Sequence, residues 1–219
     1  MAENKHLMEK PIWNALSQVA DLAILNILWI LCSLPIITLG ASTTALYDCT
    51  MKIIRQQDDG ILAMFFRSFR RNLKQGTVLT LLSAISGFFL LCDLRYFGIL
   101  DGMVFKLAFA IFAILGVFWV IAVSYVFPIL AQFDNTIPGH IRSAVLVGSM
   151  HLKRTIPIVI LNLIPVCIFL FAPSVFLVCM PIWLLCGASL IAFFNSKMLV
   201  PIFDTYINNN GMNASENKG

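Results

Sequence analysis

The sequence predicts an all-α protein: a polytopic transmembrane helix bundle of about five spans, with cytoplasmic amphipathic interfacial helices. The 219 residues are 59% hydrophobic and only 12% charged, which is about half the charge of an average soluble domain. No charged residue occurs in residues 22–47, 107–133 or 155–196. A helix that crosses a bilayer needs about 20 apolar residues, so each stretch is long enough to do so. The length fits one helical domain over residues 1–207.

The first predicted span, residues 19–39, lies mostly within the first uncharged stretch. It is broken at Pro35 and Gly40, after which a surface helix is expected over residues 42–57. Two arrangements are open for this region. Either the first span crosses fully and the N-terminus lies outside, or the chain re-enters at Pro35 and the N-terminus is cytoplasmic.

Four polar residues within the apolar stretches are candidate intramembrane contacts: Asp21, Asn26, Asn162 and Asn195. Asp21 lies near the end of its span, where a carboxylate can reach the headgroups. Asn26 lies deeper and is expected to hydrogen-bond to a neighbouring helix. Because polar groups within spans are often functional, a role as an ion or substrate ligand is the alternative.

Residues 61–75 form the clearest amphipathic helix. The apolar positions recur at helical spacing and share one face, namely Leu62, Phe65, Phe66, Phe69 and Leu73. The adjacent flank is basic and holds candidate membrane-interface or partner-docking residues, Arg67, Arg70, Arg71 and Lys74. This pattern is typical of a helix lying in the membrane plane. Binding of nucleic acid is not expected, because the segment lies between spans and lipid phosphates already explain its charge.

Two further spans are expected over residues 77–92 and 104–128, followed by a second surface helix over residues 134–152. Its apolar face is predicted to hold Ile137, Ile141, Val145, Gly148 and Leu152. Its basic residues join the docking candidates, namely Arg142, Lys153 and Arg154. His140 and His151 are expected to be interfacial, because a metal site would need further ligands.

The last uncharged stretch, residues 155–196, is long enough for two spans joined by a tight hairpin at residues 172–174. The prolines within it are tolerated in membrane helices, where neighbouring groups satisfy the freed carbonyls. The polar tail, residues 208–219, is expected to be disordered.

The distribution of basic residues predicts the orientation. All but four of the 15 Lys and Arg residues lie on the side that holds residues 40–76, residues 129–155 and the tail; the exceptions are Lys5, Lys10, Arg95 and Lys106. Because cytoplasmic loops carry the excess of positive residues, the basic helices and the C-terminus are expected in the cytoplasm.

Sequence signals for catalysis are absent. No nucleotide-binding glycine loop, zinc-protease motif or nucleophile elbow occurs. The six cysteines include no C-x-x-C pair, and the acidic residues are scattered singly rather than converging as acid–base chemistry requires. We therefore expect no enzyme activity, no cofactor and no metal.

Three blocks of sequence resemble the YesL-like family of bacterial multi-pass membrane proteins of unknown function. These are the runs LNILWILCSLPIITLGASTTALY (25–47), FFRSFRRNLKQ (65–75) and FPILAQFDNT (127–136) followed by HLKRT (151–155). The family usually has a second aromatic where this chain has Leu73. The resemblance implies a plasma-membrane protein of Gram-positive-type bacteria, without known catalytic residues. Its members are often encoded beside carbohydrate-uptake transporters.

The leading hypothesis is a non-enzymatic accessory or regulatory component linked to carbohydrate uptake. Its expected partners are anionic lipid headgroups, components of a sugar ABC transporter, and a second copy of the chain. The alternative is a small permease or channel subunit, with Asn26, Asn162 and Asn195 lining a path. A third possibility is a lipid-sensing scaffold.

Overall fold

The computed structural model describes residues 2–57 and 60–216, with side chains for residues 16–57 and 60–207. The described chain is helical throughout and contains no strand. In order, the elements are α1 (Ala2–Ser33), η1 (Ile36–Thr38), α2 (Leu39–Ile54), α3 (Ile61–Ile99), α4 (Met103–Gln132), α5 (Ile137–Met150), α6 (Leu152–Phe171), α7 (Pro173–Ile182), η2 (Trp183–Gly187) and α8 (Ala188–Glu216). Within this part of the chain, 5 helical segments are long and apolar enough to cross a membrane. The predicted all-α, multi-pass architecture is confirmed.

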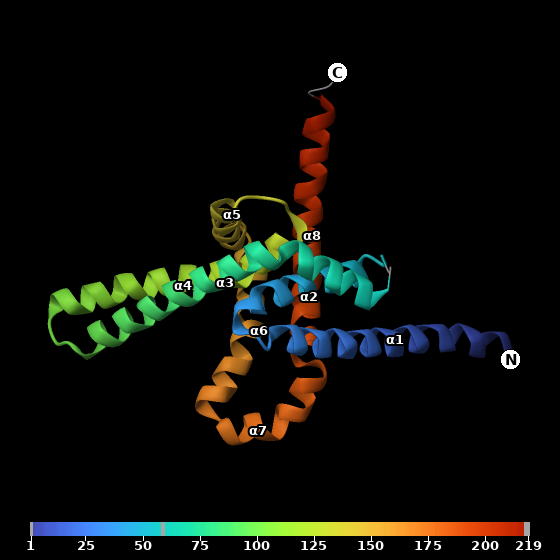
Figure 1. Ribbon diagram of the computed structural model, residues 1–219, viewed down its shortest axis with the longest axis horizontal. Coiled ribbons are helices and arrows are strands. Elements are labelled where there is room, and N and C mark those ends of the chain that lie inside the picture. Colours follow the sequence, from blue (N-terminus) through green and yellow to red (C-terminus); the bar gives the residue numbers. More distant parts are fainter. Residues whose placement is uncertain (1, 58–59, 217–219) are drawn as a thin grey trace.

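The helices radiate from a packed centre around α2 (Figure 1). The α3–α4 hairpin extends to one side, the α6–α7 segment to another, and the C-terminal part of α8 to a third. We call α2 and the buried residues of α1, α3, α4, α5, α6 and α8 that pack around it the hub. Residues 88–120 and 159–186, which we call the outer arms, contain no buried residue.

The chain turns back at Pro35. Trp29 Nε1 donates to Thr43 Oγ1 at 3.1 Å, and the Ser33 and Ser42 hydroxyls lie 2.6 Å apart. Because a later residue of α1 pairs with an earlier residue of α2, the two helices are antiparallel. Figure 1 shows the N-terminal end and the turn after α2 on the same side of the molecule, away from the tip of the α3–α4 hairpin. An antiparallel return of this kind is the arrangement that re-entry at Pro35 requires.

The expectation of a surface helix over residues 42–57 is wrong for most of its length. Every residue from Gly40 to Met51 is buried except Thr43, which is half-buried. The polar residues of α2 tolerate this burial because they bond within the helix; Thr44 Oγ1, for example, donates to Gly40 O at 2.7 Å. Gly40 does not break the helix. It lies against the backbone of Gly76, where small residues let two helices approach closely.

The predicted surface helix over residues 61–75 and the span after it form one continuous helix, α3. At 1.5 Å per residue its 39 residues extend about 58 Å, well beyond the roughly 30 Å of a hydrocarbon core. The face that packs on the hub also differs from the predicted one. Phe65 is fully buried, but Leu62 is 57% exposed, and the polar residues Ser68 and Asn72 are buried instead.

The buried face of α5 is also offset from the predicted one. It is formed by His140, Ala144, Val147 and Gly148. His140 is fully buried, so the expectation that it is interfacial is wrong. The physical reason is the close packing of α5 on α4. At Gly148, which lies against Ile121, the two helices leave no space for a side chain.

The hairpin expected at residues 172–174 is present, since α6 ends at Phe171 and α7 begins at Pro173. The return segment is interrupted by a π-helix, η2, before α8. The tail expected to be disordered from residue 208 is described as helix up to Glu216. Once a helix is anchored, each further residue adds a hydrogen bond at little nucleation cost. Residues 217–219 lie outside the described part.

Candidate functional site

Polar side chains gather inside the hub, although the helices that surround them are mostly apolar. We call this group the polar core; it consists of Asn26, Tyr47, Asp48, Thr50, Asn195 and Ser196, all buried. Buried polar groups are costly unless they are hydrogen-bonded, and more so where lipid surrounds the bundle. The hydrogen bonds of the polar core therefore show which elements these residues hold together.

Asn26 bonds to the π-helical segment η2. Its Nδ2 donates to Trp183 O at 3.1 Å and to Leu184 O at 2.7 Å, and its Oδ1 accepts from the Ser189 amide at 3.0 Å. A π-helix shifts the regular ladder of backbone bonds and leaves groups that need other partners. The Asn26 side chain supplies these partners and fixes α1 to the start of α8.

A second set of bonds joins α2, α6 and α8. Asn195 Nδ2 donates to the Tyr47 hydroxyl at 3.0 Å and to Asn162 Oδ1 at 2.8 Å. One turn further along α2, the Thr50 and Ser196 hydroxyls lie 2.8 Å apart. Three of the four candidate intramembrane residues therefore lie within or beside the polar core, while Asp21 lies half-buried on α1.

Two ion pairs lie at the C-terminal end of α2, and neither was predicted from the sequence. Lys52 Nζ lies 2.8 Å from an oxygen of the buried Asp48. Arg55 donates through Nη2 to Asp204 and through Nη1 to Gln132, both at 2.6 Å, and so joins α2, α8 and α4. The spacing of Asp48 and Lys52, four residues apart on a helix, was the available signal.

The seven docking candidates are all exposed: Arg67, Arg70, Arg71, Lys74, Arg142, Lys153 and Arg154. Two bonds join α3 to the end of α4 and to the loop that leads into α5, because Arg71 Nη2 donates to Ala131 O at 3.2 Å and Gln75 Nε2 donates to Asn135 O at 3.1 Å. Both basic groups therefore lie at the hub end of the α3–α4 hairpin. Arg71 also has a structural role.

Burial alters the chemistry of His140 on α5. Burial lowers the pKa of its imidazole below the ordinary 6.5, and the nearby Asp134 carboxylate opposes this shift. The ring is therefore neutral near pH 7. Among the described side chains, no three His, Cys, Asp or Glu residues are grouped as metal ligands.

Comparison with known proteins finds similarity to the part of the chain that forms much of the hub. A family model described as "protein of unknown function, DUF624" matches residues 22–94, and the uncharacterized protein YesL of Bacillus subtilis (strain 168) is 30% identical over 120 residues. Over these residues the chain is similar to YesL-like proteins. That alignment covers 53% of this chain and 56% of the relative, so only about half of the curated relative is matched. No solved structure matches the chain. The family match covers the C-terminal part of α1, all of α2 and most of α3, which include Asn26, Tyr47 and Asp48 of the polar core.

Proposed function

We propose that this protein is a non-enzymatic accessory or regulatory component of the bacterial plasma membrane, and that it assists carbohydrate uptake by docking a transporter component. The observation that carries the proposal is the exposure of seven cations at the hub end of the molecule. At the opposite tip of the α3–α4 hairpin, Arg95 and Lys106 are offset by Asp93 and Asp101. An exposed basic surface favours an acidic partner and speeds its association.

The same charges support an orientation in which both termini are cytoplasmic. The α1–α2 hairpin returns the chain to the side from which α1 starts, so Lys5 and Lys10 join the other basic residues. Only Arg95 and Lys106 then remain outside, which strengthens the excess of positive charge inside. An epitope tag at the N-terminus should be detected only in permeabilised cells. Detection on intact cells would refute this orientation.

Crosslinking in native membranes, followed by purification of the full chain, tests the docking proposal. We expect a sugar-transporter component to be recovered with the wild type. Recovery should fall severalfold for the double variant Arg70→Gln/Lys74→Gln. The matched control, Arg95→Gln/Lys106→Gln, removes the same charge from the opposite tip and should leave recovery unchanged. Absence of any sugar-transporter component above background counts against the proposal, as does equal loss in both variants.

The polar core favours a second candidate, a small permease or channel subunit. Polar side chains from α1, α2, α6 and α8 meet inside a membrane bundle, and such groups often mark solute paths. Solute flux into liposomes that contain only this protein would support this candidate, provided that Asn195→Leu abolishes the flux without unfolding the protein. Without flux, the accessory role stands as the better account.

A further inference from the structure

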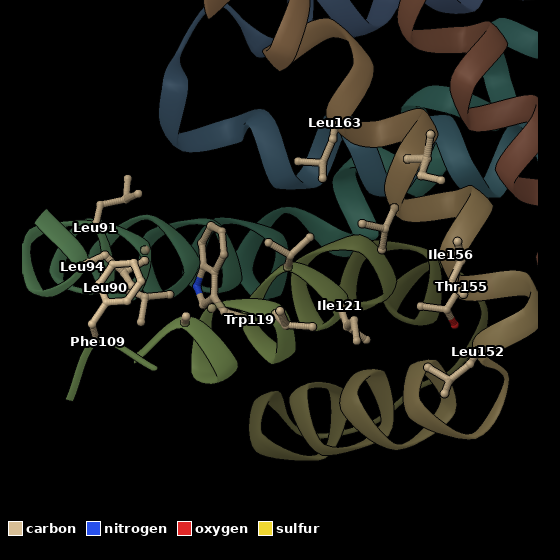
Figure 2. Close-up of a pocket in the computed structure, with 17 residues that line it drawn as sticks. Leu90, Leu91, Leu94, Phe109, Trp119, Ile121, Leu152, Thr155, Ile156 and Leu163 are labelled. Carbon is tan, nitrogen blue, oxygen red and sulfur yellow. The ribbon is translucent and has the colours of Figure 1, made fainter. Parts of the chain in front are cut away.

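An apolar groove of about 640 Å³ lies between the α3–α4 hairpin and α6 (Figure 2). It runs from Leu91 and Phe109 in the outer arm to Leu152 and Thr155 at the start of α6. Its two obvious polar groups are already bonded. Trp119 Nε1 donates to Ser86 Oγ at 3.0 Å, and Thr155 Oγ1 donates to Gly148 O at 2.7 Å. The walls therefore suit a hydrocarbon chain.

A second pocket of about 670 Å³ lies at the corner between α5 and α6, and we call it the polar pocket because its wall is more polar than that of the groove. Leu152 lines both spaces. The polar pocket also has His151, Lys153 and Arg154 on one wall and Tyr206 of α8 on the other. Within residues 16–57 and 60–207, neither Lys153 nor Arg154 is paired with a carboxylate. Their charges are available to an anion.

The position along α6 matches the depth of a lipid phosphate. The uncharged part of α6 begins at Thr155, directly after the two cations, and continues to the end of the helix. The boundary between hydrocarbon and headgroups is therefore expected near Leu152, where the groove and the polar pocket meet. The N-terminus of this 20-residue helix adds a partial positive charge at the same place.

We propose that these two spaces form one binding site for an anionic glycerophospholipid of the inner leaflet. An acyl chain occupies the groove, and the phosphate lies against Lys153 and Arg154. Basic pockets between membrane helices bind anionic headgroups in this way. The shared residue Leu152 favours a lipid over a soluble anion, because a soluble anion would have no use for the groove.

The fluorescence of Trp119, which lines the groove (Figure 2), gives a direct readout. The full chain is reconstituted in phosphatidylcholine vesicles with increasing fractions of phosphatidylglycerol that carries brominated, quenching acyl chains. The Trp119 signal is the wild type minus Trp119→Phe. A parallel titration uses brominated phosphatidylcholine. At about 1 kcal/mol for each cation near the surface, half-maximal quenching should need about 30-fold less phosphatidylglycerol than phosphatidylcholine.

Matched variants separate the two halves of the site. Lys153→Gln/Arg154→Gln should abolish the preference, whereas the charge-preserving swap Lys153→Arg/Arg154→Lys should keep it. Arg70→Gln/Lys74→Gln, which removes two cations elsewhere, should also keep it. Ala113→Phe fills the groove and should reduce quenching by both lipids, whereas Ala110→Phe, an exposed position outside the groove lining, should not.

Three results would overturn the site. The first is equal quenching by the two brominated lipids. The second is a loss of preference in Arg70→Gln/Lys74→Gln as large as in Lys153→Gln/Arg154→Gln, which would indicate a general attraction to the charged surface. The third is displacement of brominated phosphatidylglycerol by millimolar glycerophosphoglycerol or inorganic phosphate, which would indicate an anion site that does not use the groove.

Discussion

The two halves of α3 show how differently one helix can be used. In the hub, Phe65 is fully buried beside Ser68 and Asn72, and Gly76 lies against α2. In the outer arm, Phe88 is 65% exposed. Lipid tails are as apolar as these side chains, so hydrophobicity alone does not drive helices together within a membrane. The hub is therefore held by close backbone approach and hydrogen bonds, while the arm presents its apolar side chains to lipid.

This difference predicts where the bundle is sensitive to substitution. In the hub, a small polar residue or a glycine occupies a space into which few other side chains would fit. An apolar residue of the arm is one of many equivalent lipid contacts, and its replacement by another apolar residue should change little.

Gly76→Ala should destabilise the bundle most. A Cβ at this position would lie 2.7 Å from Ala41 N and 2.8 Å from Ala41 Cα, which are backbone atoms that cannot rotate away. Helix propensity alone would favour alanine by about 1 kcal/mol. We expect the overlap to reverse this and lower the free energy of unfolding by about 3 kcal/mol, measured by denaturant titration in mixed micelles.

The control for this prediction is Gly116→Ala in the outer arm. There the added Cβ would meet Leu90 Cδ2 at 3.6 Å, an ordinary contact with a flexible side chain. This variant should be neutral or slightly more stable. If both glycine variants lose the same stability, the proposed distinction between hub and arm is wrong.

Asn26→Leu should have the next largest effect. The substitution keeps the size of the side chain but leaves the Trp183 and Leu184 carbonyls and the Ser189 amide without this partner. We expect a loss of about 2 kcal/mol in unfolding free energy, measured in the same titration. Ser86→Ala, which breaks an exposed bond to Trp119 in the arm, should cost less than about 0.5 kcal/mol. A neutral Asn26→Leu would show that η2 does not depend on α1.

The sequence predicted the number of candidate spans and the hairpin at residues 172–174, because an uncharged stretch and its breaks are local features. It misplaced α2, because the burial of a helix depends on how many neighbours surround it. A mixed polar segment such as residues 42–57 reads as a surface helix when its partners are unknown. Gly40 was interpreted as a helix breaker for the same reason, whereas its role is the close approach to Gly76 of α3.

The candidate site was predictable in part. Asn26, Asn162 and Asn195 stood out as polar residues in apolar stretches, and the structure gives each a bonding partner on another element. Their partners could not be inferred, because a backbone carbonyl of η2 or the hydroxyl of Tyr47 carries no distinctive sequence signal. The link between Arg55 and Asp204 joins residues far apart in the chain, and a single sequence does not show such a pairing.

Arg55→Gln tests this link between α2 and α8. The ion pair with Asp204 is partly open to solvent, with the aspartate side chain 46% exposed, so its contribution is modest. We expect a loss of about 1 kcal/mol that shrinks as salt is raised. Arg95→Gln at the tip of the α3–α4 hairpin is the matched control and should be neutral. A loss that does not change with ionic strength would instead point to the hydrogen bond with Gln132.

His140→Met is expected to show the smallest effect, and only in acid. Burial holds the pKa of His140 below 6.5 in the folded protein, so the unfolded chain binds more protons as the pH falls through 6.5. Its contribution to stability is therefore complete above that pH and is lost progressively below it. The melting temperature of the wild type in detergent should decline from pH 7.5 to pH 5.

Removal of the buried imidazole should make that decline shallower. The half-buried His151 provides the control, since His151→Met leaves the buried imidazole in place and should keep the wild-type slope. Because Asp134 favours the charged form of His140, Asp134→Asn should steepen the acid decline. If the three variants follow the wild-type curve between pH 7.5 and pH 5, the hub does not sense protons through His140. The acid sensitivity would then have to arise from other groups.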